Sequence, residues 1–329
     1  MTQRLVFMGS DPIALPALNA ILSGECGGGV KLVAVYTQLD RARGRGKKVL
    51  PNEIKQWALE KGIEVRQPDK IGKAERLEME ALQADACLVM AYGHILSQKF
   101  IDTPLYGTWN LHTSLLPAFR GASPIQNAVI AGGNETGVSL MRLVRQMDAG
   151  PILDVEKVSI ERLDTALAVE HKLSLACVPL VKRCLSGIFL GEAETVPQDE
   201  EAATYVRKLG KDDGVLNFAV EAKVLAKRIN GLYPWPSARF TFQKNVIKVG
   251  LADYEETDTN LAPGTAIGLE NGGLRVACSQ GIVSLLKLQR AGGKMLDADA
   301  FLRGFEFPEG AVLESRSMPQ LVADHHFVG

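Results

Sequence analysis

The stretch that decides the fold is Asn110-Leu111-His112-Thr113-Ser114-Leu115-Leu116-Pro117-Ala118-Phe119-Arg120-Gly121. It begins as a short strand pattern, and side chains two positions apart on a strand point to the same side. Asn110 can offer a neutral N–H, and His112 can offer a hydrogen-bond donor or a proton. Together these groups suit an oxygen that becomes negative when a carbonyl is attacked, which indicates acyl-transfer chemistry.

A carboxylate completes this candidate site. Asp148 follows in Met147-Asp148-Ala149-Gly150, and beside an imidazole it favours the charged, proton-donating ring. The pair Asn-x-His is common by itself, and an isolated histidine is more often structural than catalytic. However, Pro117 and Gly121 fix a defined loop after the strand, where open α/β sheets bind their ligands. We therefore predict that Asn110, His112 and Asp148 are catalytic.

The first half of the chain alternates short β-rich runs with helical patterns, which predicts a Rossmann-like parallel sheet wrapped by helices. The first strand is followed by Met8-Gly9-Ser10-Asp11-Pro12. This turn holds one glycine where a dinucleotide site needs several, so a nicotinamide dehydrogenase is disfavoured. The expected strands are Arg4–Met8, Lys31–Tyr36, Ala86–Met90, Thr108–His112 and Val138–Leu143, and the expected helices are Ile13–Leu22, Glu53–Lys61, Lys73–Gln83 and Ser123–Ala131.

The pattern changes after an apolar helical run over Thr165–Leu190. Residues 191–203 are acidic and contain Pro197, the composition of a linker. Beyond them, a helix near Val220–Asn230 precedes five short strands, which predict a small OB-like β-barrel, a fold that often binds nucleic acid. We thus expect a catalytic α/β domain over 1–190, a linker over 191–203, the barrel over 204–314 and a disordered tail over 315–329. The expected barrel strands are Ser237–Phe242, Val246–Ala252, Gly264–Leu269, Gly273–Cys278 and Gly281–Leu288.

The composition limits the chemistry only weakly. The chain has 329 residues, of which 46% are apolar and 23% charged, and a formal net charge of −1. We expect a cytoplasmic protein without a membrane segment or secretory leader. The five cysteines form no CxxC pattern, and His325-His326 has no partner cluster, so neither a disulfide framework nor a metal site is expected. The cysteines are Cys26, Cys87, Cys177, Cys184 and Cys278.

The block at 110–121 resembles the signature of the folate-dependent formyltransferases, which move a formyl group from 10-formyltetrahydrofolate to an amine. Ordered motifs extend the resemblance from about residue 4 to about residue 314, including Val-Phe-Met-Gly at 6–9 and Met-Ala-Tyr-Gly at 90–93. Ala149 and Pro151 stand where the family frequently has Thr and Asp. The resemblance implies catalysis by Asn110, His112 and Asp148. The folate contacts that it implies are Ser114, Leu115, Leu116, Pro117, Met90, Ala91, Tyr92 and Gly93.

A basic segment lies between the second expected strand and the second expected helix. Five of residues 41–48 are cationic, which is typical of a solvated loop or of a phosphate-binding finger. Thr37-Gln38-Leu39-Asp40-Arg41 and Gly44-Arg45-Gly46-Lys47-Lys48 resemble an insertion in the family branch that formylates methionyl-tRNA. Leu39 and Ala42 replace usual prolines, so we expect a flexible loop. The implied contacts with initiator methionyl-tRNA are Arg41, Arg43, Arg45, Lys47 and Lys48, with Arg45 as the main one.

A second basic region covers residues 207–248, with nine lysines and arginines against three carboxylates, a net charge of +6. It predicts a basic face that follows an RNA backbone, although ordinary surface charge remains an alternative. Lys208 and Lys211 are its leading tRNA candidates. Trp235, in a Pro-Trp-Pro turn, is interpreted as a packing residue. The expected face comprises Arg207, Lys208, Lys211, Lys223, Lys227 and Arg228.

Two other functions are compatible with parts of this pattern. A formyltransferase for an amino sugar or a small ribonucleotide would share Asn110, His112 and Asp148, but it would have no use for the basic segment and the barrel. A noncatalytic RNA-binding protein would use the basic segment and the barrel, but it would not need the amide, the imidazole and the carboxylate. The family resemblance also implies a monomer.

Overall fold

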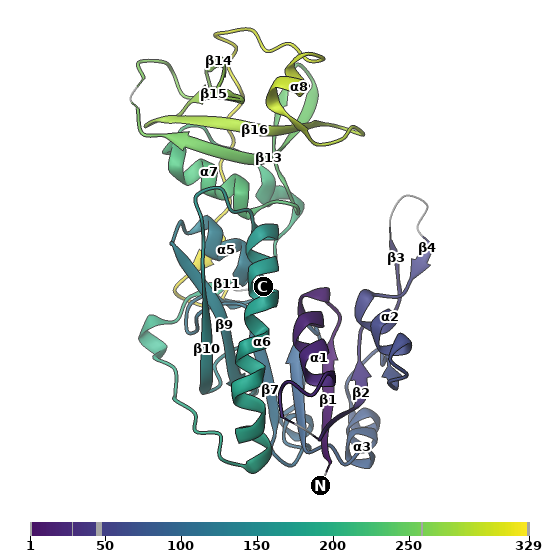
Figure 1. Ribbon diagram of the computed structural model, residues 1–329. Helices are drawn as coiled ribbons and strands as arrows, with labels where there is room; N and C mark the ends of the chain where they lie inside the picture. The colour runs from purple at the N-terminus through teal and green to yellow at the C-terminus, as the bar shows by residue number, and fades with distance from the viewer. Residues whose placement is uncertain (1, 28, 44–47, 258, 328–329) are drawn as a thin grey trace. The chain divides into compact units, whose positions relative to one another are not determined.

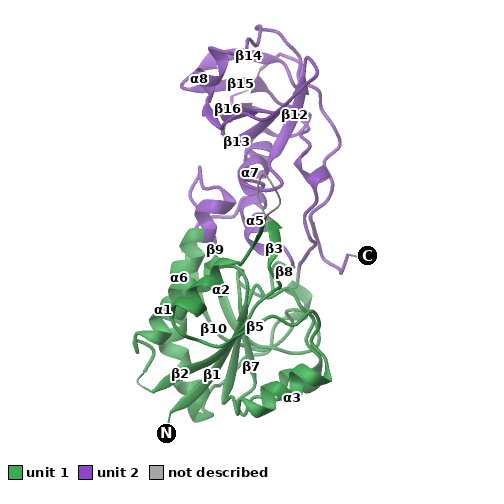
Figure 2. Cartoon of the chain, turned by 90° about the vertical axis from the view of Figure 1, so that its right-hand side faces the viewer, with its two compact units in different colours: residues 1–120, 137–158, 171–203 green, residues 121–136, 159–170, 204–329 purple. Residues whose placement is uncertain are grey.

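The computed structural model describes residues 2–27, 29–43, 48–257 and 259–327. Arg45 and Lys47, two of the expected tRNA contacts, lie outside these residues. The chain divides into two compact units (Figures 1 and 2). Unit 1 comprises residues 1–120, 137–158 and 171–203, and unit 2 comprises residues 121–136, 159–170 and 204–329.

Unit 1 is built on a seven-stranded sheet in the order β10-β9-β7-β6-β1-β2-β5. The pairs β1·β2, β1·β6, β2·β5 and β6·β7 are parallel, and β7·β9 is antiparallel. The predicted Rossmann-like, mostly parallel sheet is therefore confirmed. Its strands are β1 (Gln3–Gly9), β2 (Val30–Tyr36), β5 (Val65–Arg66), β6 (Ala86–Met90), β7 (Thr108–His112), β9 (Glu135–Arg142) and β10 (Ile152–Ser159).

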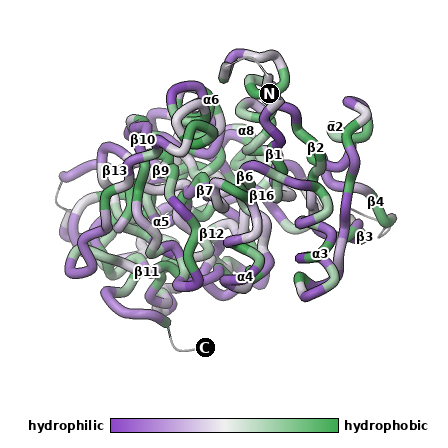
Figure 3. The backbone as a smooth tube through the Cα atoms, turned by 90° about the horizontal axis from the view of Figure 1, so that it is seen from below, coloured by the Kyte–Doolittle hydropathy of each residue, from purple (hydrophilic) through white to green (hydrophobic). Residues whose placement is uncertain are grey.

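The central strands are buried along most of their length. Every residue of β6 and β7 is buried, as are Leu5–Gly9 of β1. β6 consists of Ala, Cys, Leu, Val and Met, which are all hydrophobic on the scale that colours the tube in Figure 3. Such continuous burial is typical of parallel strands with both faces covered. The backbones of β1 and β6 approach each other closely at Gly9, where an added Cβ would lie 2.4 Å from the Met90 carbonyl oxygen, so a larger residue does not fit there.

The helices α2 and α4 begin at a residue whose side chain caps them. Asn52 accepts a hydrogen bond from the Lys55 N–H at 2.9 Å and starts α2. The helix α6 is long and apolar enough to cross a membrane, but 56% of its apolar window is buried inside the protein, as in a core helix. The helical elements up to residue 190 are η1 (Pro12–Ala14), α1 (Leu15–Leu22), α2 (Glu53–Glu60), α3 (Lys73–Ala81), α4 (Gln98–Ile101), α5 (Pro124–Ile130) and α6 (Ala166–Leu190).

Unit 2 contains the predicted antiparallel strands. Their order is β12-β13-β16-β15-β14, with β17 on β16, and within the described residues no ladder joins β12 to β14. The helix α7 packs with this sheet around Phe218, Leu225 and Val283. Its elements from residue 204 on include η3 (Lys211–Gly214), α7 (Ala222–Gly231), β12 (Ala238–Phe242), β13 (Asn245–Glu255), β14 (Ala266–Glu270), β15 (Gly273–Ala277), β16 (Ile282–Arg290), β17 (Leu296–Asp297) and α8 (Ala298–Leu302), whereas η2 (Glu200–Ala202) belongs to unit 1.

The basic segment differs from the flexible loop that was expected. Its two ends pair as antiparallel strands, β3 (Arg41–Arg43) and β4 (Lys48–Leu50), with Ala42 opposite Val49. Ala42 keeps a backbone N–H, which a proline at this position would lack. The segment is therefore a short hairpin at its base.

The chain after Glu314 also differs from the expectation of a disordered tail, which is wrong for residues 315–327. Leu321 is only 3% exposed and packs with Leu209 and Leu232. The strand β18 (Val322–Ala323) pairs with β11 (Tyr205–Val206), which in turn pairs with β8 (Arg120–Gly121). One buried leucine and two backbone pairs are too short a signal for a sequence pattern to report.

The segment 191–203 is fixed to unit 1 and is not a free linker. Ile152 and Val196 exchange two backbone hydrogen bonds of 2.8 Å. Gln198 and Glu200 contact Arg120 by their side chains. Its polar side chains therefore make contacts within unit 1.

Candidate active site

The loops after four parallel strands meet at one edge of the unit 1 sheet. The strands β6 and β7 are paired in register, with Val89 opposite Asn110, so the loops after Met90 and His112 leave at the same edge. The Ser10 N–H donates to the Ala91 carbonyl at 3.3 Å, and the Gln38 side-chain amide donates to the Tyr92 carbonyl at 2.9 Å. This is the edge at which open α/β sheets bind ligands.

Asn110 and His112 are two positions apart on β7 and share one face of the strand, as predicted from the strand period. They are 8% and 6% exposed. Among the residues that the structure describes, the Asn110 side-chain amide has no hydrogen-bond partner. A nearly buried amide without a partner is a ready donor to a ligand oxygen.

The His112 ring lies between two oxygen acceptors. Its Nε2 is 3.1 Å from the Phe119 carbonyl oxygen, and its Nδ1 is 3.7 Å from Asp148 Oδ1. A carbonyl oxygen can only accept, so Nε2 carries a proton in this arrangement. Nδ1 then faces a carboxylate, and the ring can donate at both nitrogens only when it is doubly protonated. The structure thus brings Asp148 to His112 across 36 positions of sequence.

Asp148 lies on a loop with an unusual backbone. Its φ is +50°, in the left-handed region that non-glycine residues rarely adopt. Two residues later, a Cβ on Gly150 would lie 1.8 Å from the Arg142 carbonyl oxygen, so only glycine fits there. The side-chain amide of Gln198 donates to the carbonyls of Asp148 and Gly150. Sequence reasoning missed Gln198, because its segment was read as a linker.

The Ser-Leu-Leu-Pro loop folds back on itself after β7. The Ser114 hydroxyl donates to the Ala118 carbonyl at 2.6 Å, and Ser139 Oγ joins the Ser114 carbonyl and the Leu116 N–H at 2.7 and 3.1 Å. Ser114 and Leu116 are buried, whereas Leu115 and Pro117 are partly exposed. Of the four expected folate contacts on this loop, Leu115 and Pro117 are therefore the more accessible.

The residues Met90–Gly93 alternate between the core and the surface. Met90 and Tyr92 are buried, whereas Ala91 and Gly93 are exposed and have φ values of +48° and +78°. Burial raises the pKa of the Tyr92 phenol, whose hydroxyl has no partner among the described residues. The accessible part of this expected folate edge is thus its backbone at Ala91 and Gly93.

Comparison with known proteins assigns both parts of the chain. A family described as formyl transferase matches residues 3–177, and the formyl transferase C-terminal domain matches residues 208–306. The chain belongs to the formyltransferase family. This confirms the resemblance that residues 110–121 indicated.

Relatives of this formyltransferase match almost the whole chain. The methionyl-tRNA formyltransferases of Gluconobacter oxydans and Delftia acidovorans are 39% and 38% identical over 94% of this chain, and the matches cover 99% and 97% of those proteins. A solved N-formyltransferase from Helicobacter canadensis, in complex with folinic acid and dTDP-3-aminofucose, shares the fold with a TM-score of 0.64. It is 17% identical, and the match covers 87% of this chain and 99% of that one.

The expected tRNA contacts of this formyltransferase that the structure describes lie in two regions, the β3·β4 hairpin and the segment around residues 208–211. Arg41, Lys208 and Lys211 are exposed, and the backbones of Arg43 and Lys48 are paired in the β3·β4 hairpin. Arg41 bonds to Gln38 Oε1. Beside it, hydrogen bonds from Lys55 and Gln67 hold the pKa of the Asp40 carboxyl below its usual value.

The predicted basic face of the formyltransferase is wrong for Lys227 and Arg228. Lys227 and Arg228 are buried, and Arg228 donates to the carbonyls of Asp213 and Pro319. Arg207 is bound to the Asp213 carboxylate by two hydrogen bonds of 2.6 and 2.9 Å. Lys227 and Arg228 are buried because α7 turns one side toward the core of unit 2, whereas Lys208, Lys211 and Lys223 stay exposed.

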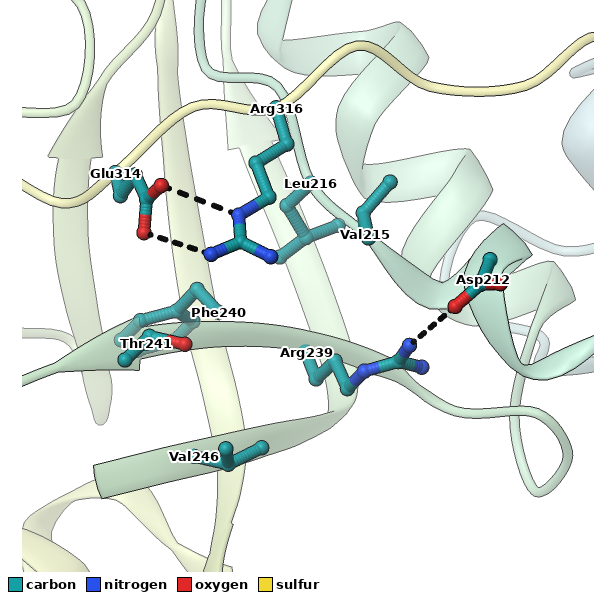
Figure 4. A pocket seen from close by; sticks show the side chains of 9 residues that line it. All are labelled: Asp212, Val215, Leu216, Arg239, Phe240, Thr241, Val246, Glu314 and Arg316. Carbon is teal, nitrogen blue, oxygen red and sulfur yellow. Dashed lines mark hydrogen bonds and ion pairs between the residues drawn. The ribbon is translucent and has the colours of Figure 1, made fainter. Parts of the chain in front are cut away.

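Unit 2 also contains a polar cavity of about 160 Å³ (Figure 4). Arg239 Nη2 lies 3.6 Å from Asp212 Oδ1, and Arg316 Nε lies 3.1 Å from Glu314 Oε1. Each guanidinium group in the cavity therefore has a carboxylate partner, so the cavity offers no uncompensated charge to a phosphate. Within the described ranges, no group of three or more His, Cys, Asp and Glu residues could hold a metal ion, and all five cysteines are buried with free thiols.

Proposed function

We propose that this enzyme transfers the formyl group of 10-formyltetrahydrofolate to the amino group of initiator methionyl-tRNA. One observation carries the proposal: identity of 38–39% to proteins named methionyl-tRNA formyltransferase extends over 94% of the chain and through both family domains. If the acceptor were an amino sugar, this identity to methionyl-tRNA formyltransferases along almost the whole chain would have no explanation. We propose that the enzyme works in the cytoplasm as a monomer.

Asn110 is the proposed donor to the formyl oxygen. When bound, 10-formyltetrahydrofolate supplies a formyl carbon that a neutral amine can attack. The Asn110 amide is 8% exposed and has no partner among the described residues, which suits an oxygen that gains negative charge as the new C–N bond forms. The donor is fixed on a strand and largely screened from solvent, so little solvent has to be reorganised around it as the charge develops.

His112 and Asp148 are the proposed pair for charge and proton transfer. His112 Nε2 donates to the Phe119 carbonyl, and Nδ1 faces the Asp148 carboxylate at 3.7 Å. In the proposed mechanism this carboxylate favours a doubly protonated ring, whose positive charge stabilises the developing oxyanion. The attacking nitrogen must lose a proton, and the departing folate nitrogen must gain one as its bond to the formyl carbon breaks. The pair relays this proton through a water molecule, and no covalent bond to the enzyme is needed.

Binding of the two substrates is assigned to different regions. For folate we propose the backbone of Ala91 and Gly93 with Leu115 and Pro117, which are the accessible members of the two motifs. The pteridine-edge motif also includes Met90 and Tyr92, and the loop also includes Ser114 and Leu116. For the tRNA phosphates we propose Arg41, Arg43, Arg45, Lys47 and Lys48, together with Lys208 and Lys211.

The deciding experiment is a formylation assay with the purified enzyme and 10-formyltetrahydrofolate. Three acceptors are compared: initiator methionyl-tRNA, elongator methionyl-tRNA and a dTDP-amino sugar. Formylmethionine released from the initiator tRNA is the expected product, and raising the salt concentration should raise the KM for tRNA. Formylation of the sugar alone, or binding of tRNA without any formylation, contradicts the proposal.

The tRNA assignment is tested separately with Arg45→Ala. We expect a KM for charged tRNA that is roughly tenfold higher with an unchanged Kd for folate, because the lost cation contacts phosphate only. Lys294→Ala, which removes an exposed cation from the C-terminal strand region, is the control and should change neither constant. Equal loss of folate affinity in Arg45→Ala contradicts this division of labour.

A further inference from the structure

We infer that Gln198 is a positioning residue for catalysis: its side-chain amide holds the backbone of the Asp148 loop and thereby keeps the carboxylate beside His112. The inference rests on the proposed catalytic role of Asp148. It assigns an active-site task to the segment 191–203, whose composition is that of a linker.

The two short hydrogen bonds that the Gln198 amide donates both go to one loop. Its Nε2 donates to the Asp148 carbonyl at 2.8 Å and to the Gly150 carbonyl at 2.7 Å. Both N–H groups of the amide are therefore used, and both acceptors are backbone atoms that flank the catalytic carboxylate. A side chain 50 positions away thus replaces the ladder partners that a strand would have provided.

The orientation of this amide is fixed by its chemistry. Gln198 Oε1 accepts from Arg120 Nε at 3.0 Å and from Arg120 Nη2 at 2.8 Å. An arginine has donors only, so a flipped amide would set N–H against N–H on one side and carbonyl against carbonyl on the other. Only the observed orientation satisfies all four bonds, and it directs the N–H groups at the Asp148 loop.

Arg120 is itself firmly anchored. It is fully buried and makes two hydrogen bonds of 2.8 Å to the Glu200 carboxylate, a charge-assisted pair in which the planar guanidinium matches both carboxylate oxygens. The segment is also tied down by the backbone bridge between Val196 and Ile152. Glu200, Arg120 and Gln198 thus form a continuous chain of bonds that ends on the Asp148 loop.

The Asp148 loop needs such support. A non-glycine residue at φ +50° stores strain that persists only where the surroundings hold it. The pair that this backbone aligns is already loose, with 3.7 Å between His112 Nδ1 and Asp148 Oδ1. If the two donors of Gln198 are lost, the backbone can relax toward an ordinary φ and carry the carboxylate away from the ring.

The test begins with Gln198→Glu, which has the same shape. It keeps an acceptor for Arg120 but replaces the two N–H donors by an oxygen. We expect kcat to fall by about 10- to 100-fold, the cost of a misplacement of about 1 Å, with KM for folate and for tRNA within about twofold of the original. Gln198→Leu, which removes the donors without adding charge, should show the same split between kcat and KM.

The matched control is Gln289→Glu in unit 2. The amide of Gln289 donates to the Gly293 carbonyl at 2.7 Å, so this change also removes a donor to a backbone carbonyl. We expect its kcat to stay within about twofold of the original. If losing a donor to a backbone carbonyl mattered only for stability, Gln198→Glu and Gln289→Glu would lower the melting temperature and the activity by similar amounts.

A double-mutant cycle with Asp148→Asn separates positioning from stability. If Gln198 acts through Asp148, Gln198→Glu costs tenfold or more in the original enzyme but about twofold or less in the Asp148→Asn background. Equal losses in both backgrounds, or normal kcat in Gln198→Glu and Gln198→Leu, overturn the inference while leaving the catalytic assignment intact. Normal kcat in Asp148→Asn rejects the catalytic assignment itself and the inference with it.

Discussion

β7 and the Asp148 loop hold the proposed catalytic side chains by different means. Asn110 and His112 are on a strand that is paired on both sides, with β6 and with β9. Asp148 is on a loop at φ +50° and depends on Gly150 and on the distant Gln198. Groups on the strand are placed by neighbouring backbone, so their removal should cost chemistry alone. The carboxylate is placed by long-range contacts, so changes that never touch it should still slow the reaction.

The largest effect is expected on β7. Asn110→Ala should lower kcat by roughly a hundredfold or more, the cost of losing one donor to a developing oxyanion. His112→Ala should do the same, because it removes the positive charge next to the site. Both variants should keep the melting temperature within a few degrees, since β7 retains its ladder bonds. Single-turnover formylation with saturating tRNA measures the chemical step, and near-normal rates in both variants would falsify the assignment.

A smaller effect is expected from Gly150→Ala, which adds only a methyl group to the loop and no polar or charged atom. Its Cβ would come within 1.8 Å of the Arg142 carbonyl oxygen, so the loop that carries Asp148 must shift. We expect kcat to fall by roughly 30- to 100-fold.

The control for this prediction is Gly187→Ala in α6, where an added Cβ meets nothing within 4 Å. That variant should keep its activity and gain up to about 1 kcal/mol of stability, because alanine favours the helix. If Gly150→Ala is equally active, the loop does not need its observed position, and the contrast with β7 disappears.

Local periodicity explains why so much of unit 1 could be predicted from the sequence. The strand Thr108–His112 was predicted with its observed bounds. Asn110 and His112 share a face because a strand has a period of two. Likewise, β12–β16 correspond to the predicted strands of the second half within a few residues.

Contacts made by single side chains over long distances could not be predicted in this way. Gln198 was missed because the meaning of one amide depends on a loop 50 residues away. Lys227 and Arg228 were placed on the surface because charge suggests exposure, whereas the helix α7 buries them with carbonyl partners. The strand β10 was missed, since half-exposed residues give it no regular alternation.

The same contrast between local and distant support exists in unit 2, where the chain after Glu314 makes few but buried contacts. Leu321→Ala should lower the free energy of unfolding by about 2 kcal/mol, because it empties a small cluster with Leu209 and Leu232. Leu261→Ala, at an exposed position, is the control and should cost less than about 0.5 kcal/mol. Urea unfolding followed by fluorescence measures both. Equal midpoints for the two variants would restore the expectation of a disordered tail.

The smallest effect concerns Asp213, whose contacts hold residues 207–213 together. Burial raises the pKa of this carboxyl, but hydrogen bonds from Arg207 and from the Gly210 N–H outweigh burial and leave the pKa below its ordinary value. A carboxyl with a lowered pKa in the folded state stabilises the fold above its ordinary pKa of about 4, and this contribution is lost as the pH falls through the lowered value.

Asp213→Asn should therefore cost about 1 kcal/mol at pH 7, and the difference from the original enzyme should shrink below about pH 4. Asp212→Asn, at a fully exposed side chain, should show no such trend. Urea midpoints at pH 7, 5 and 3.5 measure the dependence. A difference that stays constant with pH would mean that the Asp213 side chain stabilises this segment by shape and neutral hydrogen bonds, not by its charge. Arg207 would then stabilise the segment by hydrogen bonding that does not depend on charge, as the backbone ladder of β7 does, and not by charge, as the ion pair between Arg120 and Glu200 does.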